Sequence, residues 1–296
     1  MVIATGFFDG VHLGHRFILR QLVEEARRRN DESMVVTFWP HPRNVLQDDA
    51  RNLRLLTSME EKKALIRNIG VDHIEVIPFT KEFCRLSAEE YLRDYIVGKF
   101  GGKAILVGYD NRIGSDQCTP EQTAEIARRL GLDVIRPERF VSDAGIVISS
   151  TKIRNSLQTG DIEEADSMLG YQYQLYGVVV SGNRLGHTIG FPTANMQLYE
   201  PLKLIPGNGV YLVKVETLGR VYDGMCNIGV RPTLGSGNAL TVETNIFDFN
   251  EDIYGLDIRI SFVRKIRNEV KFNDFSVLAG QLEKDRAHCR ILLREK

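Results

Sequence analysis

Two histidines stand three residues apart in a glycine-rich run near the amino terminus, at residues 6–15. A short apolar stretch at residues 2–5 precedes the run, and a segment with helical periodicity, residues 17–29, follows it. This pattern predicts a strand, a tight turn and a helix, and such a turn offers N–H groups and a positive helix end to an anion. His12 and His15 could donate to phosphate oxygens and stabilise charge that develops there, so we predict a phosphate site. The alternative is a tight turn whose histidines are incidental.

A second candidate phosphate site lies at residues 148–154, where hydroxyl side chains precede a predicted helix. Lys152 and Arg154 fall in its first turn, although the helix dipole there favours anions. A bound polyphosphate that neutralises both cations would explain them; a hydroxyl cap with solvated cations is the alternative. The segment at residues 39–43 either contacts a ligand or is a loop made rigid by its prolines.

The second half of the chain carries a different set of polar residues. Three glycines within nine residues would let a phosphate chain approach the backbone: Gly182, Gly186 and Gly190. Thr193 and Asn195 follow and offer oxygen ligands to Mg²⁺. Glu243 lies in the middle of an alternating strand. It is either an ordinary solvent-facing residue or, if it points into a pocket, a base that takes a proton from a hydroxyl.

Length and composition restrict the class of protein. A chain of 296 residues with 43% hydrophobic content can form two domains. Its net charge of −1 provides no basic field for nucleic acid or an anionic membrane. The four cysteines form no C-x-x-C pair, which argues against a zinc site or disulfide framework. With no signal peptide and no apolar run near about 18 residues, we expect a cytoplasmic protein whose oligomeric state the sequence leaves open.

Up to about residue 170, short apolar runs alternate with capped helical segments. Strands are expected at residues 2–5, 34–38, 73–77, 104–107 and 134–135. One helix is expected from Arg16, capping boxes begin at Ser58 and Ser87, and Thr119 precedes a proline at a first helical position. This alternation predicts a Rossmann-like, doubly wound α/β sheet with its ligand at the carboxyl ends of the strands.

After residue 170 the apolar pattern changes to a period of two. Strands are expected at residues 175–180, 211–216, 222–228, 241–249 and 257–263, separated by turn residues. They predict an antiparallel β-barrel with a final helix, about residues 275–293, on its wall. The helix at residues 162–169 is the expected junction. We therefore divide the chain into domains 1–168 and 169–296.

Together these motifs resemble the bacterial bifunctional riboflavin kinase/FAD synthetase family over essentially the whole chain. The matching segments are residues 6–15, 40–42, 107–110, 149–154, 190–195, 227–233, 242–243, 254–255 and 266–269. The resemblance implies a nucleotidylyltransferase domain followed by a riboflavin kinase barrel. Riboflavin, FMN and ATP would be the substrates, with Mg²⁺ as the metal ion.

The resemblance also implies roles for particular residues. His12 and His15 would stabilise the ATP phosphates and the leaving pyrophosphate, and Glu243 would be the base of the kinase. Positions implied to bind ATP or phosphate are Gly6, Phe7, Asp9, Ser150, Arg154, Gly182, Gly186 and Gly190. Positions implied near the flavin are Asp110 and Arg267, and those implied to hold Mg²⁺ are Thr193 and Asn195.

The chain departs from the family pattern at a few positions. Asn111 and Ile113 replace aromatic residues, which we expect to weaken flavin stacking in the first domain. His187 replaces an arginine of the phosphate loop, and Asn245 replaces a histidine. The first strand also begins almost at Met1, where relatives have a short leader.

Two other functions remain open at this point. A single-activity nucleotidylyltransferase for another phosphorylated small molecule would explain the first half and leave the barrel motifs idle. A non-catalytic flavin-binding regulator would need neither a base nor metal ligands.

Overall fold

The computed structural model describes residues 1–41, 54–109, 111–138, 140, 148–182, 190–232, 238–270, 272 and 274–295. The chain divides into two compact units, Met1–Ser150 and Thr151–Lys296, so the division falls within helix α6 (Ser150–Thr159). The domain boundary expected after residue 168 stays a prediction. No helix in the described part of the chain combines the length and apolar character needed to cross a bilayer.

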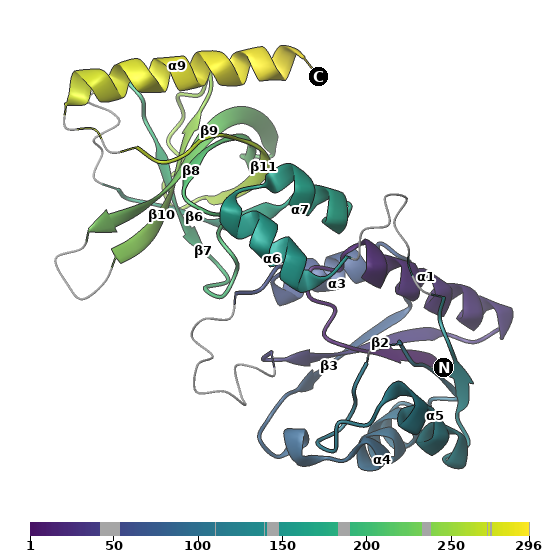
Figure 1. The fold of residues 1–296 in the computed structure, drawn as a ribbon. Helices are drawn as coiled ribbons and strands as arrows, with labels where there is room; N and C mark the ends of the chain where they lie inside the picture. The colour runs from purple at the N-terminus through teal and green to yellow at the C-terminus, as the bar shows by residue number, and fades with distance from the viewer. Residues whose placement is uncertain are drawn as a thin grey trace. The chain divides into compact units, whose positions relative to one another are not determined.

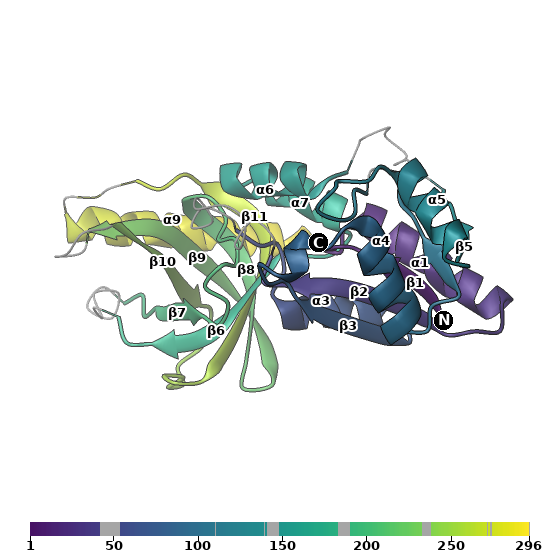
Figure 2. The same ribbon diagram turned by 90° about the horizontal axis from the view of Figure 1, so that it is seen from below.

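The first unit contains a parallel five-stranded sheet in the order β3-β2-β1-β4-β5. Its strands are β1 (Val2–Thr5), β2 (Ser33–Trp39), β3 (His73–Pro78), β4 (Ala104–Leu106) and β5 (Asp133–Ile135). Its α-helices are α1 (Leu13–Arg28), α3 (Met59–Arg67), α4 (Ala88–Tyr91) and α5 (Pro120–Arg129). A short 3-10 helix, η2 (Phe83–Arg85), precedes α4, and the π-helical η3 (Leu92–Lys99) continues it. Helices α1 and α3 cover one face of the sheet, and α4 and α5 cover the other (Figures 1 and 2). The expected doubly wound α/β fold is confirmed.

Strand β1 explains why both faces are covered. All its residues are buried, which is the pattern of a strand between two helical layers. Val2 and Ala4 pack with Leu22 of α1, whereas Ile3 packs with Ile96 on the opposite face. Because successive side chains of a strand point to opposite faces, three apolar residues supply both cores.

The expected helix caps are present, with one difference at α1. Ser58, Ser87 and Thr119 each accept the amide three residues later and complete a capping box. Helix α1 begins at Leu13 rather than Arg16, because the His12 side chain acts as its N-cap. Sequence rules assign caps to Ser, Thr, Asp and Asn, so they place the start of this helix too late.

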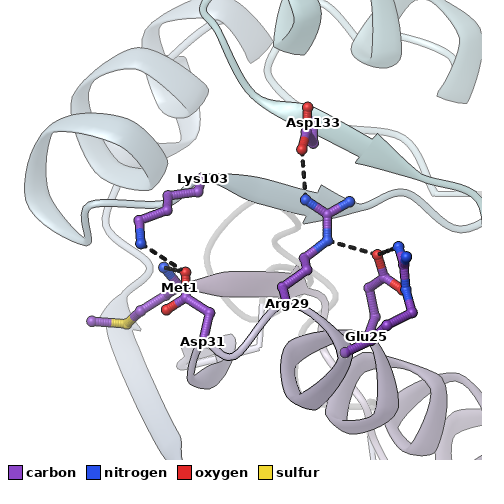
Figure 3. A network of polar contacts seen from close by, with 7 residues as sticks. Met1, Glu25, Arg29, Asp31, Lys103 and Asp133 are labelled. Atoms are coloured by element: carbon purple, nitrogen blue, oxygen red, sulfur yellow. Dashed lines mark hydrogen bonds and ion pairs between the residues drawn. The ribbon is translucent and has the colours of Figure 1, made fainter.

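An ion-pair network ties together the amino-terminal edge of the sheet (Figure 3). The Asp31 carboxylate forms ion pairs with the terminal ammonium of Met1, at 3.1 Å, and with Nζ of Lys103, at 3.0 Å. Nearby, Arg29 pairs with Glu25 at 2.6 Å and with Asp133 at 2.5 Å. These contacts join the end of α1 to the start of β5, at the edge opposite the histidine turn.

The second unit is a closed antiparallel barrel in the order β10-β7-β6-β11-β8-β9. Its strands are β6 (Gln174–Val180), β7 (Ala194–Leu198), β8 (Gly209–Thr217), β9 (Arg220–Pro232), β10 (Asn238–Ile246) and β11 (Asp257–Arg267). Strand β7 is not among the strands expected from the sequence. It brings Asn195 directly opposite Glu243 of β10.

Helix α7 (Ile162–Leu169) follows α6, and helix α9 (Phe275–Arg294) lies along the barrel (Figure 1). Cys289 of α9 is fully buried in a cluster with Leu212 of β8 and Met225 of β9. The expectation of a barrel with a terminal helix on its wall is confirmed.

Candidate active sites

The turn after β1 leaves the carboxyl edge of the sheet and leads directly into α1. Gly6 N donates to Val36 O at 3.0 Å and extends the pairing with β2. Phe8, Gly10 and Val11 then adopt left-handed backbone conformations, with φ of 47°, 81° and 36°. A β-branched valine is strained there and needs surrounding contacts to keep it in place.

A buried carboxylate supplies those contacts. Asp9 is 4% exposed and accepts the Leu56 and Thr57 amides at 3.1 and 3.2 Å and the Thr57 hydroxyl at 3.3 Å. Gly10 N donates to the Thr57 hydroxyl at 3.2 Å, and Ser150 Oγ donates to the Asp9 carbonyl at 3.0 Å. Asp9 thus braces the turn against the segment before α3, and its contact with ATP stays a prediction.

The two histidines meet at the start of α1. Their rings stack with centroids 3.6 Å apart, and His12 Nδ1 accepts the His15 amide at 3.3 Å. Burial lowers the pKa of His12 to about 4, and the nearby charge of Asp9 only partly opposes it. Burial, with the charges of His12 and Lys62, also lowers the pKa of His15.

Both rings are therefore neutral at neutral pH. Because Nδ1 of His12 accepts a hydrogen bond, its proton is on Nε2, where it can be donated to an anion. His15 Nδ1 is buried and meets no partner among the described residues.

Lys62 is a residue of this site that the sequence analysis missed. It lies on α3 and is 5% exposed, and burial lowers its pKa while the charge of Asp9 acts to raise it. In the sequence it is one of two adjacent lysines, Lys62 and Lys63. The only sequence feature that indicates burial of Lys62 is its helical spacing from the apolar Ile66, four residues later.

A cavity of about 360 Å³ lies in the first unit beside the turn. Five aromatic side chains contribute to its lining: Phe7, Phe38, Phe79, Phe83 and Tyr91. Phe7, expected at ATP, is thus on this wall, and Gly6 also lines it. Asn111 and Ile113, two of the departures from the family pattern, line the same cavity, and Asn111 Nδ2 donates to Thr5 O at 3.1 Å. The cavity suits a flat aromatic ligand.

Helix α6 carries the second predicted phosphate site. Ser150 is its first residue, and its hydroxyl is held by the Asp9 carbonyl. Arg154 lies one turn further along α6 and is half-buried in the second unit. Their contacts with ATP stay predictions.

Three polar residues stand side by side across three strands of the barrel. Glu243 of β10 is directly opposite Asn195 of β7 on one side and Asn227 of β9 on the other. Directly opposed residues project from the same face of a sheet, so these side chains form one row. Asn227 is a member of this row that the sequence analysis did not single out. Glu243 is half-buried, which places it between the two environments considered for it.

Glycine allows the close packing of Asn195. A Cβ at Gly182 would come within 2.3 Å of the Asn195 amide nitrogen, so a larger residue does not fit without a shift. Gly190 has φ of 77°, a conformation that side chains other than glycine rarely adopt. Both glycines therefore have a conformational or packing reason in addition to the phosphate contact predicted for them.

A second cavity, of about 570 Å³, lies against residues of β7 and β10 that are next to this row in sequence. Thr193, Ala194 and Thr244 line it. Ala194 and Thr244 are paired and alternate with Asn195 and Glu243, so the polar row projects from the other face of the same strands. Asn245 Nδ2 donates to Pro192 O at 2.7 Å and fixes the residue before Thr193.

The donors around this segment fit a magnesium ion that is held mainly by phosphate. Thr193 and Asn195 offer neutral oxygens, and the described residues contain no group of three or more His, Cys, Asp or Glu that could hold a metal. Mg²⁺ keeps several waters and needs only one or two protein ligands beside substrate phosphates.

Arg267 of β11 forms an ion pair with a buried carboxylate of helix α9. Its guanidinium pairs with Asp285 at 2.7 Å, and that carboxylate is 3% exposed and also accepts Gln281 Nε2 at 2.8 Å. Its predicted flavin contact stays a prediction. Asp110, Gly186 and His187 lie outside the described residues.

Comparisons with known proteins agree in both halves of the chain. Residues 1–152 match a family model described as FAD synthetase, and residues 169–293 match one described as riboflavin kinase. A bifunctional riboflavin kinase/FMN adenylyltransferase of Bacillus subtilis is 37% identical, over 96% of this chain and 90% of its own. The Escherichia coli protein of the same name is 36% identical, over 98% and 91%.

One solved structure is similar over nearly the whole chain. It is a Streptococcus pneumoniae protein described as a macrolide-efflux protein, 33% identical with a TM-score of 0.88. The match covers 98% of this chain and 93% of that one.

The buried histidines predict a loss of stability in mild acid. His12 has a pKa of about 4 in the fold against 6.5 ordinarily, so between these values the unfolded chain binds a proton that the folded chain does not. The free energy of unfolding should therefore fall by about 2 kcal/mol from about pH 7 to about pH 5 through His12 alone. Urea unfolding at both pH values measures the loss, and His12→Gln should reduce it. An equal loss in both proteins would contradict this origin.

Proposed function

The chain belongs to the bifunctional riboflavin kinase/FMN adenylyltransferase family, and from that premise we propose how its residues divide the two reactions. The enzyme phosphorylates riboflavin to FMN with one ATP and joins FMN to the adenylyl group of a second ATP, releasing pyrophosphate. A single-activity transferase would leave the kinase half unexplained, and a regulator would leave Glu243 and the histidine pair without a purpose.

Adenylyl transfer is assigned to the first unit, and the aromatic cavity beside the turn carries this assignment. The flavin ring would occupy the cavity lined by Phe7 and Phe38, with the FMN phosphate toward the turn. The FMN phosphate oxygen then attacks the α-phosphorus of ATP and pyrophosphate leaves. His12 and His15 donate to the leaving phosphates, and no protein nucleophile is needed.

Phosphorylation of riboflavin is assigned to the barrel, because the strand register sets Glu243 beside Asn195. Glu243 takes the proton of the ribityl 5′-hydroxyl, and that oxygen attacks the γ-phosphorus of ATP with ADP as leaving group. Thr193 and Asn195 would hold Mg²⁺, which when bound neutralises charge on the phosphates. The cavity beside Thr193 has the volume for a nucleoside.

We also propose a cytoplasmic location. All four cysteines are free, and three of them are buried, which suits a reducing compartment.

Replacing His15 by alanine should separate the two activities. Removing one preformed donor to developing phosphate charge lowers kcat by about 10²–10³-fold, so FAD formation from FMN should fall by that factor while FMN formation from riboflavin stays unchanged. Chromatography of the products measures both. His73→Ala, a histidine at the opposite edge of the sheet, is the matched control. If FAD synthesis falls less than about tenfold, His15 acts as a structural residue.

Replacing Glu243 by glutamine should stop the kinase alone. The amide keeps the size of the side chain but cannot accept the ribityl proton, and a positioned base contributes about 10²–10⁴-fold. Adenylylation of supplied FMN should remain near wild type. Because Asn195 is the cross-strand neighbour, the KM for ATP in the kinase reaction is measured as well. Glu216→Gln, an exposed glutamate of β8, is the control, and a kinase rate that barely changes would make Glu243 an ordinary strand residue.

Restoring an aromatic residue in the cavity should improve FMN capture. Ile113→Phe adds a ring face beside the cavity, and aromatic pairs contribute about 0.5–1.5 kcal/mol, so the KM for FMN should fall several-fold. The KM for ATP should not change. Ile113→Leu keeps the size without the ring, and steady-state kinetics compares the two. An FMN KM equal to that of wild type in Ile113→Phe rules out the cavity as the flavin site.

A further inference from the structure

Two lysines are buried in the described part of the chain, and they differ in their surroundings. Lys203 lies over the ring of Tyr173, 4.7 Å from its centroid. Lys62 is 5% exposed, and its side chain makes no hydrogen bond or ion pair with any described residue. Burying most of a cationic side chain without an ion-pair partner among the described residues is costly, so the residue needs an explanation.

The position of Lys62 on α3 directs it toward the histidine turn. It shares the buried face of α3 with Ile66, which packs in one cluster with Phe8 and Val11 of the turn. Helical side chains lean toward the amino terminus of their helix. For Lys62 that is the direction of Thr57, where Asp9 accepts its hydrogen bonds.

Two electrostatic effects agree with this direction. The charge of Lys62 lowers the pKa of His15, and the charge of Asp9 raises that of Lys62. Lys62 is therefore close enough to both Asp9 and His15 for its charge to interact with them.

Asp9 is not the direct partner of the ammonium. Its carboxylate already accepts two amides and a hydroxyl from Leu56 and Thr57, and no nitrogen of Lys62 lies within ion-pair distance of it. The buried Nδ1 of His15 also has no partner among the described residues. Among the described residues, a largely buried cationic side chain without an ion pair and a buried ring nitrogen without a hydrogen bond thus lie in the same part of the site.

We propose that Lys62 is a phosphate-binding residue of the adenylylation site, and that its ammonium donates to the phosphate chain of ATP and stabilises the leaving pyrophosphate. The proposal rests on the proposed function, which puts the ATP phosphates at this turn. A compact ammonium in a site shielded from water is well suited to charge that builds up on oxygen during the transfer.

The experiment compares Lys62→Met with Lys63→Met in the full chain. Lys63 is the next residue of α3, and it instead pairs with the exposed Glu60 at 3.4 Å. FAD formation, FMN formation and the melting temperature with and without inorganic pyrophosphate are measured for both variants and for Lys62→Arg.

The expected result is a fall in FAD formation of about 10²-fold or more in Lys62→Met, with FMN formation unchanged. Its melting temperature should not fall, because an apolar group replaces a largely buried cation that has no ion pair among the described residues. Pyrophosphate should raise the melting temperature of the wild type, Lys63→Met and Lys62→Arg, but not that of Lys62→Met.

Three results would overturn the role of Lys62. One is FAD formation within about tenfold of wild type in Lys62→Met. Another is an undiminished response of that variant to pyrophosphate. The third is a variant that melts early or fails to fold, because Lys62 would then be the structural counter-charge of Asp9. A wild type that forms FMN but no FAD would instead refute the proposed function of the first unit.

Discussion

The buried carboxylate of Asp9 is the constraint on which the first site depends. The turn that contains it has residues in left-handed conformations, one of them a valine, and a turn of this kind does not persist without outside contacts. Asp9 provides them by accepting the amides of Leu56 and Thr57, immediately before α3. One side chain therefore fixes the turn and the start of α3 together. The same brace brings the buried face of α3, and with it Lys62, to the start of α1, where the histidine pair lies.

The two sites are built by different means. In the first unit, helix starts and a strained turn gather neutral imidazoles and N–H groups, which suits the binding of phosphate charge. In the barrel, register alone gathers the polar residues, because Glu243 is paired with Asn195 and Asn227 on neighbouring strands. A slip of one residue in β10 would turn Glu243 to the other face. Contacts such as Asn245 with Pro192 keep the segment around Thr193 in place relative to this row.

Three residues that depart from the family pattern lie in the described part of the chain, and each lies beside one of the two sites. Asn111 and Ile113 lie on the wall of the aromatic cavity, so replacing aromatic residues at these positions removes ring surface from the cavity wall. Asn111 also holds the Thr5 carbonyl at the end of β1, and Asn245 holds Pro192. In both cases the amide side chain supplies a donor to the backbone beside a site. Asn111 and Asn245 thus form hydrogen bonds that hold the backbone beside each site in place.

The sequence by itself determined the fold class, the capped helices and the two families of motifs. These features are set by local periodicity and by hydrogen bonds within a few residues, as at Ser58 and Thr119. The tertiary structure alone decided that His12 caps α1, that β7 brings Asn195 to Glu243, and that Lys62 rather than Lys63 is buried. The last two depend on contacts between segments far apart in the chain, which local patterns do not encode. The His12 cap is a local contact, but capping rules do not include histidine. The Asp9 brace links residues 47 and 48 positions apart, and such a distance leaves no trace in sequence spacing.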